Sequence, residues 1–149
     1  MRAVIQRVKK ASVTVSGEEV GRINSGFVVF LGVEKGDQAR DLEYMVNKIS
    51  GLRAFEDDNG KMNLALSDVS GEILVVSQFT LLGDCRKGRR PSFTDAADPI
   101  KAQKLYNDFN MEMEKLNIKV STGVFQETME VSLVNDGPVT FLLDSKKIF

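Results

Sequence analysis

The polar segment Ser77-Gln78-Phe79-Thr80 directly follows the apolar run 73–76, which is typical of a buried strand. A strand end holds polar groups in a fixed place, and loops after strands commonly carry active sites. The hydroxyls of Ser77 and Thr80 and the amide of Gln78 are therefore candidate catalytic groups. Phe79 is a candidate substrate-binding residue because its ring could stack on a base. The pattern alone favours a plain polar strand end with Phe79 buried.

A second polar segment, residues 135–140, lies between two apolar strand-like runs and contains Gly137-Pro138. Proline cannot donate to a sheet ladder, so it marks an edge, a bulge or a special turn. Glycine followed by proline is also a pair in which a cis bond costs little. Such a pair would fix backbone carbonyls in an unusual direction. The commoner meaning of the string is a hairpin turn at Asp136-Gly137, and this alternative stays open.

The third segment is a short basic run on a glycine-containing loop, and its cations are Arg86, Lys87, Arg89 and Arg90. Four cations in five residues could hold phosphates, although a solvated loop explains them equally simply. The acidic run 56–58 could bind a metal ion, but a solvated turn is the expected structure.

Composition excludes several kinds of chemistry. The chain has no histidine and one cysteine, Cys85, which rules out Ser-His-Asp and Cys-His arrangements and internal disulfides. Structural zinc is not expected either, so we expect neither metal nor cofactor, although a carboxylate-only magnesium site stays possible. Without histidine, Thr80 has no evident base, which makes a side-chain nucleophile doubtful. The net charge of −1 gives no global signal for nucleic acid.

The 149 residues suit one domain, 1–149, with a real core. No apolar run is long enough to span a bilayer, and the first seven residues are too polar for a signal peptide. We therefore expect a cytoplasmic protein that makes no membrane contact.

The elements that must position these segments are mostly strands. Seven are predicted by β-branched or apolar runs besides 73–76. They are 3–8, 11–15, 18–23, 27–31, 119–122 and the two that flank the second polar segment, 131–134 and 139–143. Run 27–31 is expected to be buried on both faces. Ser16-Gly17 and the cluster 57–60 are predicted turns.

The sequence predicts two helices. Asp37 is the predicted cap of the first, whose apolar stripe is Leu42, Met45, Val46 and Ile49, and Gly51 ends it. Asp98-Pro99 predicts the start of the second, which runs to about Asn117. Its stripe is Ala102, Leu105, Phe109, Met113 and Leu116, and Met111, Met113 and Met129 are predicted to be core residues. The pattern indicates an α/β, α+β-like fold, with a layered mixed sheet or barrel-like core and both helices on one side.

Stretches in order across nearly the whole chain resemble one family, the D-aminoacyl-tRNA deacylases. They are residues 1–8, 31–33, 60–64, 76–81, 87–93 and 131–140. SQFT at 77–80 and NDGPVT at 135–140 are specific as a pair, whereas either alone would be weak. The stretch Phe125-Gln126-Glu127 differs from the small residues associated with that position in the family.

The resemblance implies a homodimeric enzyme that hydrolyses the ester of D-aminoacyl-tRNA, with mischarged glycyl-tRNA as second substrate. It implies that residues 77–80 line the pocket for the adenosine and aminoacyl group, and that Asn135 and Thr140 belong to the binding segment. It also implies that Gly137-Pro138 is cis, rejects L-amino acids and reaches the other subunit's site. The tRNA 2′-hydroxyl would replace a protein base, and Thr80 would position substrate first and act as nucleophile second.

Three rival functions stay open on the sequence alone. They are an RNA-binding module without catalysis, a dimerisation domain in which NDGPVT only forms an interface, and an esterase that acts on small molecules. The ordered pair of motifs favours an editing hydrolase over all three.

Overall fold

A long strand organises the sheet of this computed structural model, which describes all 149 residues. β1 (Arg2–Val15) pairs in antiparallel fashion with β3 (Gly26–Gly32) through its first half and with β2 (Glu18–Ile23) through its second. Its other edge pairs with β8 (Glu130–Asp144) along almost its whole length. The predicted strands 3–8 and 11–15 are therefore one strand, because pairing on both edges carries the backbone through the polar residues between them.

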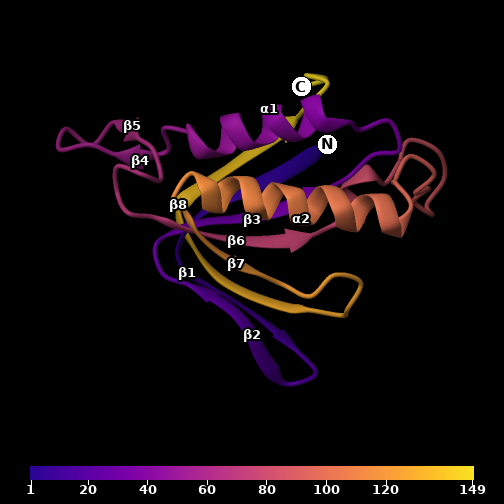
Figure 1. Cartoon of the computed structure of the whole chain (residues 1–149), viewed down its shortest axis with the longest axis horizontal. Coiled ribbons are helices and arrows are strands. Elements are labelled where there is room, and N and C mark those ends of the chain that lie inside the picture. Colours follow the sequence, from indigo (N-terminus) through magenta and orange to yellow (C-terminus); the bar gives the residue numbers. More distant parts are fainter.

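The sheet is mixed, as predicted, because β6 (Glu72–Ser77) lies parallel to β3 and β7 (Lys119–Thr122) lies parallel to β6. β7 approaches β2 closely enough to give the sheet a barrel-like shape (Figure 1). At this seam the Ser121 hydroxyl donates to the Arg22 carbonyl oxygen at 2.9 Å.

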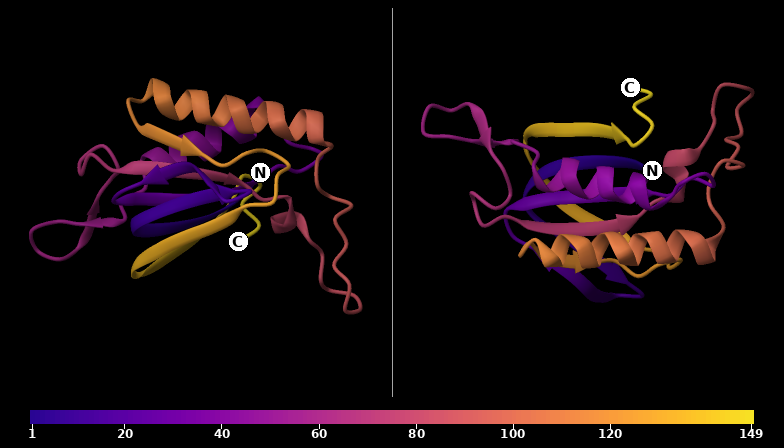
Figure 2. Two further views of the ribbon diagram at one scale, coloured as in Figure 1. Left: turned by 90° about the horizontal axis from the view of Figure 1, so that it is seen from below. Right: turned by 45° about the horizontal axis from the view of Figure 1, so that its top comes forward.

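Both helices cover one face of the sheet, α1 (Ala39–Ser50) and α2 (Pro99–Lys115) (Figure 1). The main core lies between this layer and the sheet, and 20 buried residues form it. Neither helix has the length and apolar character needed to cross a membrane. A small hairpin of β4 (Phe55–Glu56) and β5 (Met62–Leu64) projects from the body, where the sequence predicted only a turn (Figure 2).

The predicted start of α2 is confirmed, because the Asp98 carboxylate accepts a hydrogen bond from the Lys101 amide at 3.0 Å. The predicted cap of α1 is wrong. Gln38 is the N-cap, and its amide donates to the Asp41 carboxylate at 2.9 Å. Asp37 cannot cap the helix because its carboxylate is already bound elsewhere. Gly51 follows the last turn of α1, as predicted.

Two apolar residues of α2 do not lie where the sequence predicted. Met111 is half exposed, because it lies on the outer face of the helix, and Leu116 is 47% exposed just past its end. Met113 is fully buried and Met129 packs against the smaller core cluster under β1 and β6.

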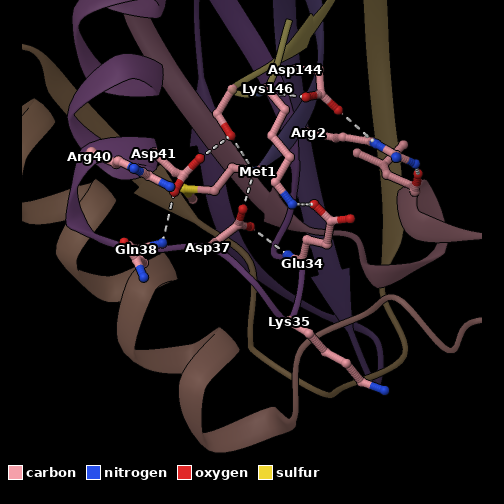
Figure 3. A network of polar contacts seen from close by, with 12 residues as sticks. Met1, Arg2, Glu34, Lys35, Asp37, Gln38, Arg40, Asp41, Asp144 and Lys146 are labelled. Carbon is pink, nitrogen blue, oxygen red and sulfur yellow. Dashed lines mark hydrogen bonds and ion pairs between the residues drawn. The ribbon is translucent and has the colours of Figure 1, made fainter. Parts of the chain in front are cut away.

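The carboxylate of Asp37 binds the α-ammonium group of Met1 at 2.6 Å, and both groups are fully buried (Figure 3). The same ammonium group donates to the Ser145 hydroxyl at 2.6 Å, and that hydroxyl donates to Asp41 at 2.7 Å. This network joins the residue just before β1, the start of α1 and the segment after β8 (Figure 3). It fixes where β1 and β8 begin and end relative to the helix layer.

Replacing Asp37 with alanine would leave the Met1 ammonium group buried without its carboxylate. We expect Asp37→Ala to lower the free energy of unfolding by about 3–5 kcal/mol, measured by urea denaturation. Asp58→Ala is the control, because Asp58 is exposed and makes no side-chain hydrogen bond, and its loss should stay below about 0.5 kcal/mol. Equal losses for the two variants would contradict the structural role of the buried pair.

Candidate functional site

A cavity of about 300 Å³ opens beside the end of β6, and most of its wall is apolar. Ser77, Gln78 and Phe79 form one side, and the far sides come from α2 and the segment between β7 and β8. The lining residues are Leu31, Val33, Val76, Ser77, Gln78, Phe79, Ala97, Ala102, Tyr106, Phe125, Gln126, Glu127, Met129 and Val131. Glu127 is the only carboxylate among them.

The backbone of residue 78 continues the pairing of β6 with β3. Its amide donates to the Leu31 carbonyl oxygen at 2.9 Å, after which the chain turns into the short 3₁₀ helix η1 (Phe79–Leu82). Gly32 makes this turn possible, because a Cβ there would lie 2.9 Å from the carbonyl oxygen of Gln78 and 2.6 Å from the side chain of Leu82. The segment is thus held against the sheet by a close backbone contact.

Thr80 is exposed and does not line the cavity, although it adjoins it. Its hydroxyl oxygen accepts a hydrogen bond from the side-chain amide of Gln78. A neutral amide donor does not make an oxygen more nucleophilic, and the hydroxyl has no basic partner to take its proton. The geometry suits Gln78 and Thr80 to orienting a substrate by hydrogen bonds.

Tyr106 forms the floor of the cavity on the α2 side. Its hydroxyl donates to the Val75 carbonyl oxygen at 2.8 Å, and its side chain is buried. Burial raises the pKa of Tyr106 to about 12, and the neighbouring Asn110 amide opposes this shift only in part. The phenol is therefore neutral throughout the physiological range and cannot serve as a base.

Residues 135–140 form a wide bulge within β8. Gln6 pairs with Thr140 and Val8 pairs with Asn135. Between these two pairs, one residue of β1 lies opposite four residues of β8. The peptide bond between Gly137 and Pro138 is cis. The hairpin alternative is wrong, because both halves of β8 run antiparallel to the same strand. The two predicted strands that flank the segment are accordingly one strand.

A buried arginine on the inward face of β1 holds the bulge, and sequence reasoning missed it. The Arg7 guanidinium donates to the Asp136 carbonyl oxygen at 3.2 Å and to the Ala54 carbonyl oxygen at 2.6 Å. It also lies 3.3 Å from the Asp136 carboxylate. The signal was present, since Arg7 continues the alternation of the buried residues Ala3 and Ile5.

Asn135 closes the base of the bulge from the other side. Its side-chain amide donates to the carbonyl oxygen of Arg7 at 2.8 Å and to that of Val139 at 3.0 Å. Thr140 accepts a hydrogen bond from the Gln6 side chain at 3.2 Å. Asn135 therefore supports the backbone of the segment and does not project into the cavity.

Gly137 and Pro138 are exposed, and neither lines the cavity of its own chain. Of β8, only Val131 reaches that cavity. The structure of one chain thus brings residues 77–79 to the cavity and leaves the predicted residues 135, 137, 138 and 140 outside it.

The basic run lies on a loop that extends well beyond the body of the molecule (Figure 2). Backbone hydrogen bonds between Asp84 and Ser92, at 2.7 and 3.0 Å, close this loop at its base. Arg86 is not free, because its guanidinium binds the Asp84 carboxylate at 2.8 and 2.9 Å and holds the pKa of that carboxyl well below its usual range. The other three cations, at 87, 89 and 90, are exposed and form no ion pair.

In the acidic run 56–58, Glu56 ends β4, and Asp57 and Asp58 lead into the turn between β4 and β5. The Asp57 carboxylate accepts hydrogen bonds from the backbone amides of Asn59 and Lys61 at 2.9 and 3.1 Å, and these bonds lower its pKa. No group of three or more histidine, cysteine, aspartate or glutamate side chains in the chain could hold a metal ion.

The mixed sheet under two helices carries an apolar cavity whose lining, apart from the exposed Glu127, has only neutral hydrogen-bonding groups, an arrangement suited to a hydrolase that acts on an activated ester. Residues 4–144 match the model of the D-Tyr-tRNA(Tyr) deacylase family, and the chain belongs to this family. It is therefore a hydrolase that acts on the ester bond of D-aminoacyl-tRNA.

Similar proteins cover the full length of the chain. D-aminoacyl-tRNA deacylases of Thermosipho africanus and Thermosipho melanesiensis are 60% and 59% identical over the whole of both chains. The solved structure of a c-Myc DNA unwinding element binding protein is 42% identical, with a TM-score of 0.91, over 97% of this chain and 98% of its own. A probable eukaryotic D-amino acid tRNA deacylase shares the fold, with a TM-score of 0.82 at 18% identity, over 95% of this chain and 97% of its own.

The raised pKa of Tyr106 makes stability depend on pH in the alkaline range. Below pH 10 the phenol is neutral in both states, and above pH 10 only the unfolded chain ionises, so stability falls until pH 12. Between pH 9 and pH 11 the wild type should lose about 1 kcal/mol more than Tyr106→Phe, measured by urea denaturation. Parallel losses in the two proteins would show that Tyr106 ionises as readily in the folded state.

Proposed function

We propose that this protein proofreads aminoacyl-tRNA by hydrolysing D-aminoacyl and mischarged glycyl esters while it spares L-aminoacyl esters. The observation that carries the proposal is the cavity at the end of β6, which Gln78 lines and Thr80 adjoins, and whose lining has no histidine, no cysteine and one carboxylate, the exposed Glu127. A wall of this kind can position an activated ester, but it supplies no strong base or nucleophile for an unactivated one. An enzyme that works on aminoacyl-tRNA would act in the cytoplasm, where that substrate is made.

Catalysis in this proposal depends on position. An aminoacyl ester needs a placed water and donors aimed at the developing oxyanion, and one such donor is typically worth about 3 kcal/mol. The substrate's own ribose 2′-hydroxyl takes the part of the base that the cavity lacks. Ser77, Gln78 and Thr80 orient the ester, and Thr80 ranks as a positioning residue before a nucleophile because its hydroxyl already accepts a bond from Gln78.

Selection between enantiomers is assigned to the backbone at Gly137-Pro138. A rigid backbone placed where an L side chain would project rejects that enantiomer without recognising any D side chain by shape. The rigidity comes from Arg7 and Asn135, which hold the bulge from both sides. Glycine has no side chain to be rejected, which makes glycyl-tRNA the expected second substrate.

The bulge acts on the cavity of a second copy in this proposal, so the working unit is a homodimer. Gly137 and Pro138 are exposed on the single chain and do not line its cavity, which leaves them available to a partner. The unpaired outer edge of β8 lies along the same strand, and a sheet edge left open in this way favours pairing with another chain. The three free cations of the extended loop contact tRNA phosphates.

Hydrolysis of matched D- and L-aminoacyl-tRNA by the purified protein tests the proposal. We expect rapid release of the D-amino acid and of glycine, and little release of the L-amino acid. A free D-amino acid ethyl ester is the control that separates an editing enzyme from a general esterase. Equal rates for the two enantiomers, or no hydrolysis of the D form, would overturn the proposal.

Gly137 has φ of +133°, and a Cβ there would lie 2.5 Å from the Val139 side chain and 2.8 Å from its amide nitrogen. Gly137→Ala must therefore shift the bulge. We expect about a hundredfold lower kcat/KM for D-aminoacyl-tRNA or a measurable gain of L-aminoacyl-tRNA hydrolysis, since misplacing a site by about 1 Å costs that much.

Gly60→Ala is the matched control for this substitution. It is also a positive-φ glycine, but a Cβ there meets nothing within 4 Å, and it lies in the β4–β5 turn away from the cavity. Both variants carry backbone strain, whereas only the change at 137 crowds β8. If Gly137→Ala keeps full activity and still spares the L form, the assignment of selectivity to this segment is wrong.

A further inference from the structure

Two exposed aromatic rings form a pair, of which Phe79 lines the cavity and Phe93 does not. Phe79 is 59% exposed and Phe93 is 36% exposed, and their ring centroids lie 5.1 Å apart with planes inclined by 68°. Both side chains stay accessible to solvent in this edge-to-face arrangement, Phe79 more so than Phe93. The prediction that Phe79 is buried is therefore wrong, because η1 turns the side chain away from the sheet.

The backbone fixes the pair in place. Phe79 begins η1, and Phe93 directly follows the bridge between Asp84 and Ser92 that closes the basic loop. Gly83 lies under the pair, where a Cβ would be 2.9 Å from the ring of Phe93. The second ring thus packs onto bare backbone, and both rings are attached to structured elements.

The pair lies between the cavity and the free cations. Phe79 lines the cavity, and Phe93 adjoins the loop whose cations Lys87, Arg89 and Arg90 form no ion pair. Aromatic faces that are flanked by cations are the usual means by which proteins hold single-stranded RNA, with bases on the rings and phosphates on the cations.

We propose that Phe79 and Phe93 form a stacking platform for the nucleobase that precedes the terminal adenosine of the aminoacyl-tRNA. The inference rests on the proposed function, because it takes the terminal adenosine to occupy the cavity. The single-stranded 3′ end then runs from the cavity over the two rings toward the basic loop. Stacking uses the ring face and tolerates any base, so the platform positions the strand without reading its sequence.

A groove on the opposite side of the cavity is the rival path. It shares Tyr106 and Phe125 with the cavity and runs along α2 past Asn107 and Met111. Its lining includes Glu114 and contains no lysine or arginine. A strand that carries one phosphate per nucleotide is disfavoured there, which points to the path over the aromatic pair.

Phe93→Leu tests the platform, because it removes the ring face and keeps an apolar side chain. We expect kcat/KM for D-aminoacyl-tRNA to fall about tenfold, within the range for one base stacked on one ring. A tRNA that is abasic at the penultimate nucleotide should lose a similar factor with the wild type. Variant and abasic substrate together should lose little more than either alone, because both remove the same contact.

Met111→Leu is the control for the rival path, since Met111 is half exposed in the groove. It should have the same kcat/KM as the wild type with both substrates. Phe93→Tyr keeps a ring face, so its kcat/KM should stay close to that of the wild type. Thermal unfolding checks that each variant is folded. Any of three outcomes would overturn the platform. The losses from Phe93→Leu and from the abasic substrate could multiply, Phe93→Leu could show no loss, or only Met111→Leu could show one.

Binding of uncharged tRNA, measured in parallel, separates this inference from the proposed function. If the wild type fails to hydrolyse D-aminoacyl-tRNA, the proposed function fails. The effects of Phe93→Leu and of the abasic nucleotide are then compared on the Kd for uncharged tRNA. A tenfold weaker Kd that depends on the penultimate base supports the platform, whereas an unchanged Kd overturns it.

Discussion

The register of β8 against β1 is the constraint on which the candidate site depends. The two strands pair over almost their whole length, and the surplus residues of β8 collect between Val8 and Gln6 of β1 as a bulge. Because pairing is secure on both sides, the bulge cannot relax by sliding, since a one-residue slip would turn every apolar side chain to the wrong face. Arg7 then fixes the shape of the bulge from within, as a buried cation that needs the carbonyl oxygens around it.

The cavity, like the bulge, depends on the placement of its polar groups. Apart from the exposed carboxylate of Glu127, its polar groups are two amides, one hydroxyl and one neutral phenol, and the phenol of Tyr106 is held by the Val75 carbonyl oxygen of β6. The site therefore relies on where groups are placed more than on how they ionise, which suits a substrate whose ester is reactive before it binds. Backbone atoms are well suited to this work because their positions are set by the sheet.

Local patterns predicted the parts of the fold that local forces decide. Most of the strands, the Asp98 cap and the mixed sheet followed from apolar periodicity and turn residues, whereas β4 and β5 were not predicted and β1 and β8 were each predicted as two strands. The cap at Asp37 and the exposure of Phe79 did not, because a buried terminal ammonium group and a 3₁₀ turn are tertiary events. Likewise SQFT marked one wall of the cavity, whereas the contribution of Arg7 required knowledge of which carbonyls lie opposite it.

The extended basic loop has a consequence for the approach of a partner through solution. A molecule with a net charge of −1 exerts no general pull on a polyanion, yet it carries three uncompensated cations at one extremity. Such a layout acts as a dipole. Within roughly 10 Å, the Debye length at ordinary ionic strength, it turns an approaching polyanion toward that extremity and away from the rest of the surface. Orientation during diffusional encounter, more than attraction, is what this arrangement of charge supplies.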